Sequence, residues 1–315
     1  MSVELKQPLI CVVGPTASGK TALAQAIAEK LPAAVMSADS MQVYRGMDIG
    51  TGKILASERS VSYYGLDVVD PGEAFSASLF QAYARPIIES RDREGERTLL
   101  CGGTGFYVRA VIDDFVFPAG EQVGNSIRDY YTALLRSSGP QAVWDALNSV
   151  DPASAQVIPI ADSKRVIRAL EIHEEGLSYA EQKEQFAEIE AYYPSIQIGL
   201  QVEPEVLAAR INARVDAMME AGLLNEVESL LAQGMRDAIT SQQAIGYKEF
   251  VAYLDGDTSL AEAVDAVKLA TRRYAKRQRT WFRKDQRIHW LDATDFNLEA
   301  LCQASLEIIE GLKHE

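Results

Sequence analysis

The octapeptide Gly14-Pro15-Thr16-Ala17-Ser18-Gly19-Lys20-Thr21 constrains the fold more than any other part of the chain. It fits the phosphate-loop pattern G-x-x-x-x-G-K-[ST] and lies between an apolar, β-branched run at 9–14 and a helical pattern over 21–31. In such a strand, loop and helix unit, backbone N–H groups surround an anion, Lys20 neutralises phosphate oxygens and Thr21 can ligate Mg²⁺. The octapeptide is therefore a predicted phosphate-binding loop, with Thr21 as its metal ligand.

Hydrophobic periodicity indicates how the rest of the chain is organised. Buried strands are predicted at 34–37, 98–101, 196–202 and 288–291, separated by helical stretches, which favours an α/β fold with a parallel sheet. Between about 118 and 194 only helices are predicted, over 126–136, 141–148 and 163–175, the last opened by Asp162 as a possible cap. Further helices are predicted over 205–233 and 260–281, with a closing helix to Leu312. We therefore predict an α/β core, 1–117 and 195–315, with a helical insertion domain at 118–194.

The charge of the chain is distributed unevenly. The formal net charge is −14, which alone argues against a nucleic-acid partner. The segment 268–287 nevertheless holds nine basic residues and one acidic residue, and so carries +8. This segment predicts a positive helix that faces a polyanion, and the alternative is a solvated helix face.

Other compositional features exclude several classes of protein. No apolar stretch approaches the length of a membrane span and the N-terminus lacks a signal-peptide pattern, so we expect a cytosolic protein without a membrane partner. The three cysteines, Cys11, Cys101 and Cys302, are far apart in the sequence. They are expected to be buried in the core rather than to form disulfides or a zinc site. We also expect a monomer.

Asp39 is the first candidate for catalysis outside the phosphate loop. It follows the predicted strand at 34–37, so it should lie at the carboxyl edge of the sheet, where open α/β proteins bind ligands. A carboxylate there could hold Mg²⁺ or accept a proton from an attacking amine. The alternative is that Asp39 only caps the turn that follows the strand.

Six sequence blocks occur in order along almost the whole chain: GPTASGKT at 14–21, SADSMQVYRGMDIGTGK at 37–53, GGTGFYVRA at 102–110, RALEI at 168–172, QAIGYKE at 243–249 and AKRQRTWF at 275–282. Together they resemble the tRNA dimethylallyltransferase family in its bacterial form. That family joins a dimethylallyl group from its diphosphate to N6 of the adenine beside the anticodon and uses Mg²⁺. Its fold is a P-loop kinase-like core with a helical insertion, which agrees with the organisation predicted above.

The resemblance implies a role for each matching residue. Asp39 would take the N6 proton, while Thr16, Lys20 and Arg214 would hold and neutralise the diphosphate. The implied tRNA contacts are Asp39, Ser40, Met41, Gln42, Thr104, Lys164, Arg165, Gln243, Gly246, Tyr247 and Lys248. The basic segment agrees with an RNA partner, because Arg272, Lys276, Arg279 and Arg283 recur at helical spacing on one side, and they are also predicted tRNA contacts. The partners would be dimethylallyl diphosphate and the anticodon stem-loop of tRNA.

Two further expectations concern individual positions. Gly52 stands where the family more often has alanine, which we expect to be a mild change. Tyr274 and Trp281 share an apolar stripe with Val267 and Ala270, so we expect them in the core rather than stacked on bases.

Three other functions stay open at this stage. A small-molecule kinase of the nucleotide or shikimate kinase type would share the strand, loop and helix but would use ATP. An isopentenyltransferase for free adenine nucleotides would prenylate AMP without RNA. An RNA-binding protein with a degenerate loop is disfavoured by the intact Lys20, Thr21 and Asp39.

Overall fold

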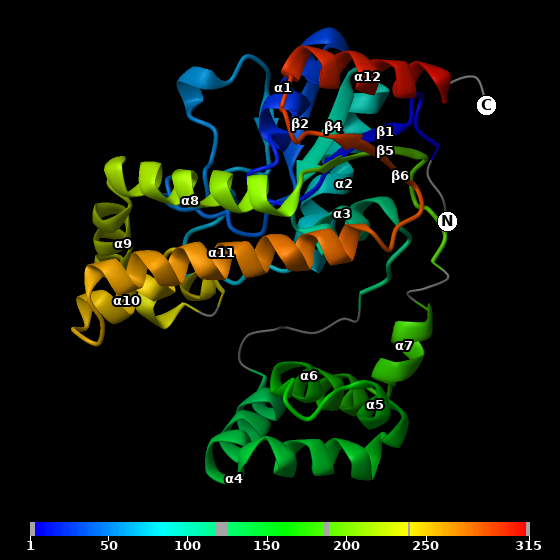
Figure 1. The fold of residues 1–315 in the computed structure, drawn as a ribbon. Coiled ribbons are helices and arrows are strands. Elements are labelled where there is room, and N and C mark those ends of the chain that lie inside the picture. Colours follow the sequence, from blue (N-terminus) through cyan, green and yellow to red (C-terminus); the bar gives the residue numbers. More distant parts are fainter. Residues whose placement is uncertain (1–3, 118–124, 186–188, 239, 313–315) are drawn as a thin grey trace. The chain divides into compact units, whose positions relative to one another are not determined.

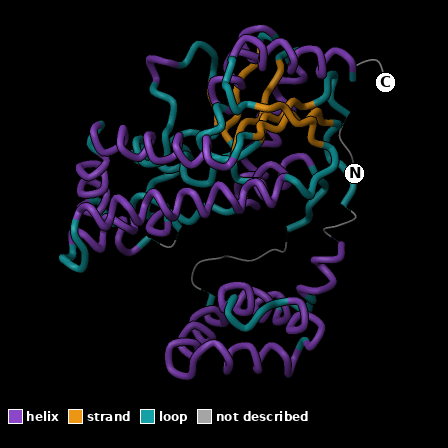
Figure 2. Tube along the Cα trace, viewed as in Figure 1, coloured by secondary structure: helices purple, strands orange, loops and turns teal. Residues whose placement is uncertain are grey.

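The computed structural model describes residues 4–117, 125–185, 189–238 and 240–312 (Figure 1). The chain divides into two compact units, Met1–Asp114 with Ala191–Glu315, and Phe115–Glu190. The boundaries expected from the sequence, at 118 and 194, differ from these by a few residues. The sheet lies in the first unit, whereas the described elements of the second are all helices (Figure 2).

The first unit is built on a six-stranded sheet of order β3-β2-β4-β1-β5-β6, in which all neighbouring strands are parallel. Its strands are β1 (Leu9–Val13), β2 (Ala33–Ser37), β3 (Tyr63–Tyr64), β4 (Arg97–Gly102), β5 (Ser195–Gln201) and β6 (Ile288–Asp292). Every residue of β1 and β2 is buried, as is usual for parallel strands covered on both faces. The predicted parallel α/β sheet is confirmed, while the two-residue β3 is too short to appear in an apolar pattern.

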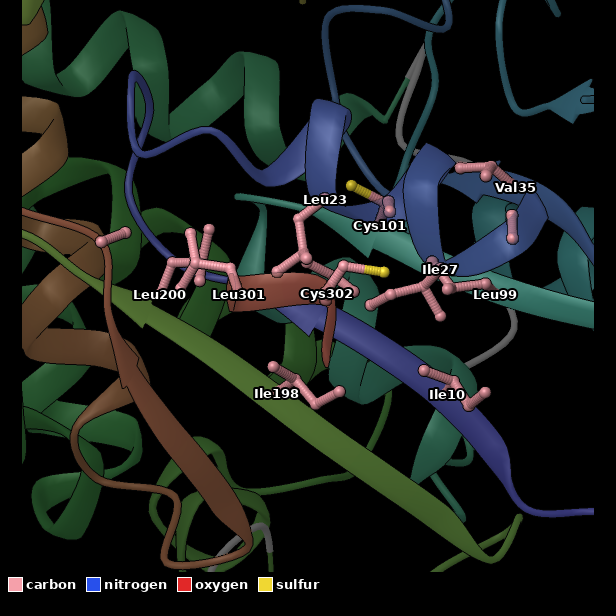
Figure 3. Packing of buried hydrophobic residues seen from close by; sticks show 14 of the residues in the cluster. Ile10, Leu23, Ile27, Val35, Leu99, Cys101, Ile198, Leu200, Leu301 and Cys302 are labelled. Atoms are coloured by element: carbon pink, nitrogen blue, oxygen red, sulfur yellow. The ribbon is translucent and has the colours of Figure 1, made fainter. Parts of the chain in front are cut away.

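Helices cover both faces of this sheet (Figure 1). One face is covered by α1 (Lys20–Lys30) and α12 (Leu298–Gly311), and the other by α2 (Ala77–Arg93) and α3 (Gly105–Ile112). Figure 3 shows the core beneath α1 and α12, where Leu23 and Ile27 meet Leu301 and strand residues such as Ile198. All three cysteines are free and buried, which confirms the prediction for them.

Four further helices, α8 (Pro204–Glu220), α9 (Leu223–Ala232), α10 (Lys248–Leu254) and α11 (Leu260–Phe282), complete the first unit, together with 3-10 turns at Ala56–Glu58, Met235–Asp237 and Ser241–Gln243. The stretch predicted as continuous over 205–233 is two helices, because Gly222 has a φ of +96° and begins α9. Helices α8 and α11 run side by side (Figure 1) and are joined by a salt bridge of 2.5 Å between Lys268 and Asp216. None of the described helices combines the length and the apolar character needed to cross a bilayer.

The second unit contains α4 (Ser126–Val150), α5 (Pro152–Val157), α6 (Ser163–Glu174) and α7 (Tyr179–Gln185). Helix α4 is interrupted at Gly139, whose φ is +81°, so the two helices predicted at 126–136 and 141–148 are its halves. Asp162 accepts a hydrogen bond from the Arg165 N–H at 3.2 Å and caps α6, as predicted. The only carboxylate buried among the described residues of α6, Glu171, is neutralised by Arg128 at 2.6 Å and Arg168 at 3.1 Å.

The core assignment predicts a stability difference. Ile27→Ala should lower the free energy of unfolding by about 2–5 kcal/mol, because a fully buried side chain would leave a cavity beneath α12. Leu298→Ala is the matched control, because Leu298 is 37% exposed at the start of α12 and should change stability by only about 0.5 kcal/mol. Chemical denaturation followed by circular dichroism measures both, and equal losses would contradict the assignment.

Candidate active site

The predicted site residues converge at one edge of the sheet. Strands β2, β4 and β1 are consecutive, and their carboxyl ends lead into Asp39, Thr104 and the phosphate loop respectively. Since parallel strands end at the same edge, segments distant in sequence meet there. A cavity of about 1250 Å³ opens at this edge, within the first unit.

Most of the predicted residues of the first unit line this cavity. They are Thr16, Ala17, Gly19, Lys20, Thr21, Asp39, Ser40, Met41, Gln42, Arg214, Gln243, Gly246 and Lys248. Those that belong to the same unit but do not line it are Gly14, Pro15, Ser18, Thr104, Tyr247, Arg272, Lys276, Arg279 and Arg283. Lys164 and Arg165 lie in the second unit, on the exposed first turn of α6.

The phosphate loop depends on its glycines. Gly14 has a φ of +140°, and a Cβ there would lie only 2.7 Å from the Leu200 carbonyl oxygen of β5. Gly19 begins α1 with a φ of +92°, where a side chain would be strained. The loop can therefore pack against β5 and point the N-terminus of α1 at the cavity, which is the arrangement that binds anions.

Lys20 provides the positive charge at the base of the loop. Its Nζ donates to the Pro15 carbonyl oxygen at 2.6 Å, so the side chain is held back against the loop. Burial, with a contribution from the positive Arg214, lowers the pKa of Lys20 to about 8, although Asp39 acts in the opposite direction. The ammonium is thus poorly compensated by the protein's own groups, and a bound anion would compensate it.

Asp39 both shapes its turn and lines the cavity. Its Oδ1 accepts a hydrogen bond from the Met41 N–H at 2.9 Å. This is the turn-capping role that the sequence left open as the alternative for Asp39. Within the described chain Oδ2 has no hydrogen-bond partner. One oxygen is therefore fixed by the backbone, and the other can bind a proton or a ligand.

The turn after Asp39 is held by side chains from neighbouring segments. Thr104 Oγ1 accepts from the Ser40 N–H at 3.1 Å. Gln42 Oε1 accepts from Ser37 Oγ at 2.8 Å, and its Nε2 donates to the Thr51 carbonyl oxygen at 3.3 Å. The polar groups of Ser40 and Gln42 thus have fixed positions in the cavity wall. Thr104 does not line the cavity itself but holds Ser40, which does.

Arg214 approaches the phosphate loop from α8 and depends on Gly52. Its Nη2 lies 3.5 Å from the Thr51 carbonyl oxygen, and burial lowers its pKa. Gly52 has a φ of +59°, and a Cβ at that position would lie 1.6 Å from Arg214 Nη2. We expected glycine in place of alanine at position 52 to be a mild change. It instead determines where the Arg214 guanidinium lies, because a side chain at position 52 would displace it.

Tyr247 belongs to the core, which corrects the prediction that it contacts RNA. It is 1% exposed, and its hydroxyl donates to Glu226 at 2.6 Å. The other bonds of Glu226 are accepted from the backbone N–H groups of Asp48, Ile49 and Gly50, at 2.7 to 3.1 Å. Tyr247 thus acts through Glu226 to hold the loop at 48–50, which lines the cavity.

Gln278 is a site residue to which the sequence assigned no role. It is buried on α11, where its Oε1 accepts from the Thr16 N–H at 2.8 Å and its Nε2 donates to the Gly103 carbonyl oxygen at 2.9 Å. One amide therefore joins α11 to the phosphate loop and to the end of β4. Gln278 lies in the AKRQRTWF block, where the neighbouring cations indicated RNA binding. A neutral amide among them did not indicate a role in the site.

Some cations of the basic segment 268–287 are engaged by other side chains of the protein. Arg272 donates to Asn212 of α8 at 2.5 Å and so joins two helices, and Arg287 pairs with Asp113 and Asp285. Arg273 and Arg277 line the cavity, and they belong to the basic segment but were not among the predicted tRNA contacts. Across the described ranges, no ion pair to a carboxylate engages Arg273, Lys276, Arg277, Arg279, Arg283 or Lys284.

The prediction that Tyr274 and Trp281 lie in the core is partly wrong. Tyr274 is half-buried and lines the cavity, whereas Trp281 is 43% exposed. Val267 is buried, as expected, so the apolar stripe is covered only along the earlier turns of α11.

Comparison with known proteins identifies what this arrangement resembles. The family model described as IPP transferase matches residues 42–285, and the one described as isopentenyl transferase matches residues 7–62. The tRNA dimethylallyltransferase of Halalkalibacterium halodurans is 45% identical over 313 residues, covering 99% of both chains.

Two solved structures of enzymes with related names are also similar to this chain. The full-length tRNA isopentenylpyrophosphate transferase of Bacillus halodurans has a TM-score of 0.69 and 42% identity, with 98% of this chain and 100% of that chain covered. A eukaryotic dimethylallyltransferase described as acting on tRNA has a TM-score of 0.77 and 29% identity, with 92% of this chain and 75% of that chain covered.

The pKa of Lys20 predicts a pH dependence of anion binding. Because the ammonium form binds phosphate oxygens, the affinity for pyrophosphate should fall as the pH rises through about 8. Isothermal titration calorimetry between pH 7 and 9.5 would measure it, with Lys20→Met as the control. Titration of pyrophosphate itself affects both proteins equally, so identical pH profiles would contradict the assignment.

The two hydrogen bonds of Gln278 predict a second effect on anion binding. Gln278→Met should weaken pyrophosphate binding by about tenfold, because the Thr16 N–H and the Gly103 carbonyl would lose their partner and the loop would have to be ordered by the ligand. Lys276→Met, on the exposed side of the same helix, should leave the affinity unchanged. The prediction fails if both variants bind pyrophosphate as the parent protein does.

Proposed function

Because the chain belongs to the tRNA dimethylallyltransferase family, we propose that it transfers a dimethylallyl group from dimethylallyl diphosphate to N6 of the adenine 3′-adjacent to the anticodon of tRNA. The observation that supports this most directly is the shared cavity of the phosphate loop, Arg214 and Asp39. It combines a binding site for a leaving diphosphate with a base for the attacking amine. The reaction releases diphosphate.

The cations of the cavity act on the leaving group. As the bond between the prenyl C1 and the diphosphate oxygen breaks, negative charge grows on that oxygen and positive character on the allylic carbon. Lys20, Arg214 and residues of the phosphate loop line the same cavity, and they would stabilise the growing negative charge. Thr16 and Gln278 contribute by holding the loop, since the Thr16 N–H is already bonded to Gln278.

Asp39 completes the reaction at the nucleophile. N6 forms the new bond to C1 and loses a proton, which the carboxylate accepts. The hydrogen bond from the Met41 N–H fixes one carboxylate oxygen and leaves Oδ2 for this proton. Since an adenine stacked in the anticodon loop cannot reach such a cavity, it enters flipped out of the stack, and Ser40 and Gln42 present polar groups to it.

The residues present fit a bound Mg²⁺. Thr21 is exposed at the start of α1 and lines the cavity beside the phosphate loop, so its hydroxyl would hold the ion. No cluster of three or more His, Cys, Asp or Glu side chains suited to a metal occurs in the part of the chain that the structure describes. Mg²⁺ at phosphate sites typically needs one or two protein oxygens, substrate phosphates and water, and it would supply further charge neutralisation of the diphosphate.

The proposal is tested by product analysis. The protein would be incubated with Mg²⁺, dimethylallyl diphosphate and an anticodon stem-loop with adenines after the anticodon, and the nucleosides would be separated. Prenylated adenosine at the position after the anticodon is the expected product. Parallel reactions with AMP or with ATP identify the alternatives, since modified AMP indicates a nucleotide enzyme and ADP formation with unmodified RNA indicates a kinase.

Asp39→Asn should separate catalysis from binding. The amide oxygen can still accept from the Met41 N–H, so the turn is retained, but the side chain can no longer take the N6 proton. Single-turnover transfer should fall at least about a hundredfold, while the affinity for pyrophosphate stays near that of the parent protein. Loss of pyrophosphate binding instead would show that Asp39 is a metal or structural residue.

A further inference from the structure

Two aromatic side chains, one on α11 and one on α3, are exposed and are not explained by the proposed chemistry. Trp281 of α11 is 43% exposed and Phe106 of α3 is 37% exposed. Their rings meet edge to face, with centroids 6.3 Å apart and an interplanar angle of 77°. Tryptophan is enriched at binding interfaces, where its apolar ring and its N–H can both be used.

The local structure fixes the indole in this exposed place. A Cβ at Gly105 would lie 2.1 Å from the indole of Trp281, so the ring rests directly on the backbone at the start of α3. Phe106 follows Gly105 on the same turn, and its ring contacts the Trp281 ring. The two rings are therefore a preorganised surface rather than two free side chains.

The aromatic pair adjoins the cavity through both of its helices. On α11, Tyr274 and Gln278 precede Trp281 by seven and three residues, which places all three on one side of the helix, and the first two line the cavity. On α3, Phe106 is two residues from Thr104, which bonds to Ser40 in the cavity wall. A chain whose one base entered the cavity would pass its neighbouring base close to the rings.

The charges beside the pair suit a polyanion. Arg277 and Lys284 lie four residues before and three residues after Trp281, which is the spacing of neighbours on one side of α11 and its continuing turn. Both are exposed, and neither pairs with a carboxylate among the residues described. Aromatic rings between uncompensated cations form the arrangement that binds unpaired nucleotides by stacking and by phosphate neutralisation.

We propose that Trp281 and Phe106 form a stacking site for the RNA base adjacent to the adenine that enters the cavity. This rests on the proposed function, since it names how that RNA is held. Stacking on aromatic faces tolerates any base, so the site would position the RNA chain rather than select its sequence. It would also compensate for the stacking that the flipped adenine loses in the anticodon loop.

The test measures binding of a fluorescently labelled anticodon stem-loop by anisotropy over a range of salt concentrations. Trp281→Ala should raise the Kd by about tenfold without changing the slope of log Kd against log salt, because a neutral ring is lost. Trp281→Phe keeps a ring and should bind nearly as well as the parent protein, and Phe106→Ala should show a smaller loss with the same slope. Arg277→Met should instead reduce the slope by about one.

Two controls separate recognition from folding. Leu298→Ala removes an exposed apolar side chain of α12 that does not line the cavity, and it should bind RNA normally. The variants at Trp281, Phe106 and Leu298, which do not line the cavity, should keep the parent affinity for pyrophosphate. RNA should also quench tryptophan fluorescence of the parent protein, and Trp281→Phe should lose most of this quenching although Trp144 and Trp290 remain.

The outcomes distinguish the two proposals. If the parent protein binds and prenylates the stem-loop while Trp281→Ala and Phe106→Ala bind it equally well, the stacking site is overturned and the proposed function stands. If the parent protein neither binds nor modifies the RNA, both are overturned. Weaker binding with an unchanged salt slope and lost quenching supports the site.

Discussion

The parallel pairing of β2, β4 and β1 is the constraint on which the rest of the first unit depends. It brings Asp39, Gly103 and the phosphate loop to one edge, although they are separated by long stretches of sequence. An antiparallel pairing would send one of these segments to the opposite edge. The buried apolar strands and the helices on both faces are therefore also the reason that the Asp39 carboxylate and the phosphate loop share one cavity.

Two side chains hold the loops at this edge of the sheet in fixed positions. Gln278 reaches across 262 residues of sequence to bond Thr16, and Glu226 reaches 178 residues to bond Asp48. Both come from the helices that follow β5, so the later part of the chain holds the loops formed by the earlier part. This explains why the basic helix α11 has a buried amide among its cations.

The sequence predicted those features that are local. The phosphate loop and its helix, the parallel sheet, the cap at Asp162 and the position of Asp39 all follow from short patterns, and Arg214 came from the family resemblance. The contacts of Gln278, Glu226 and Gly52 were not predictable, because they join segments whose approach depends on the whole fold. The prediction that Trp281 lies in the core was wrong for a related reason. Helical periodicity shows which residues share a face of a helix, but not how far along the helix other segments cover that face.

Glu226 has a consequence that extends beyond the loop it holds. Three successive backbone N–H groups, from Asp48, Ile49 and Gly50, converge on its carboxylate, in the way that backbone N–H groups surround anions at phosphate sites. The cavity is thus bordered by two segments that solvate negative charge with their backbone. One of them is occupied by an anion that is covalently part of the chain. Under the proposed function the other would exchange its anion with solvent, so only the phosphate loop would reorganise when diphosphate departs.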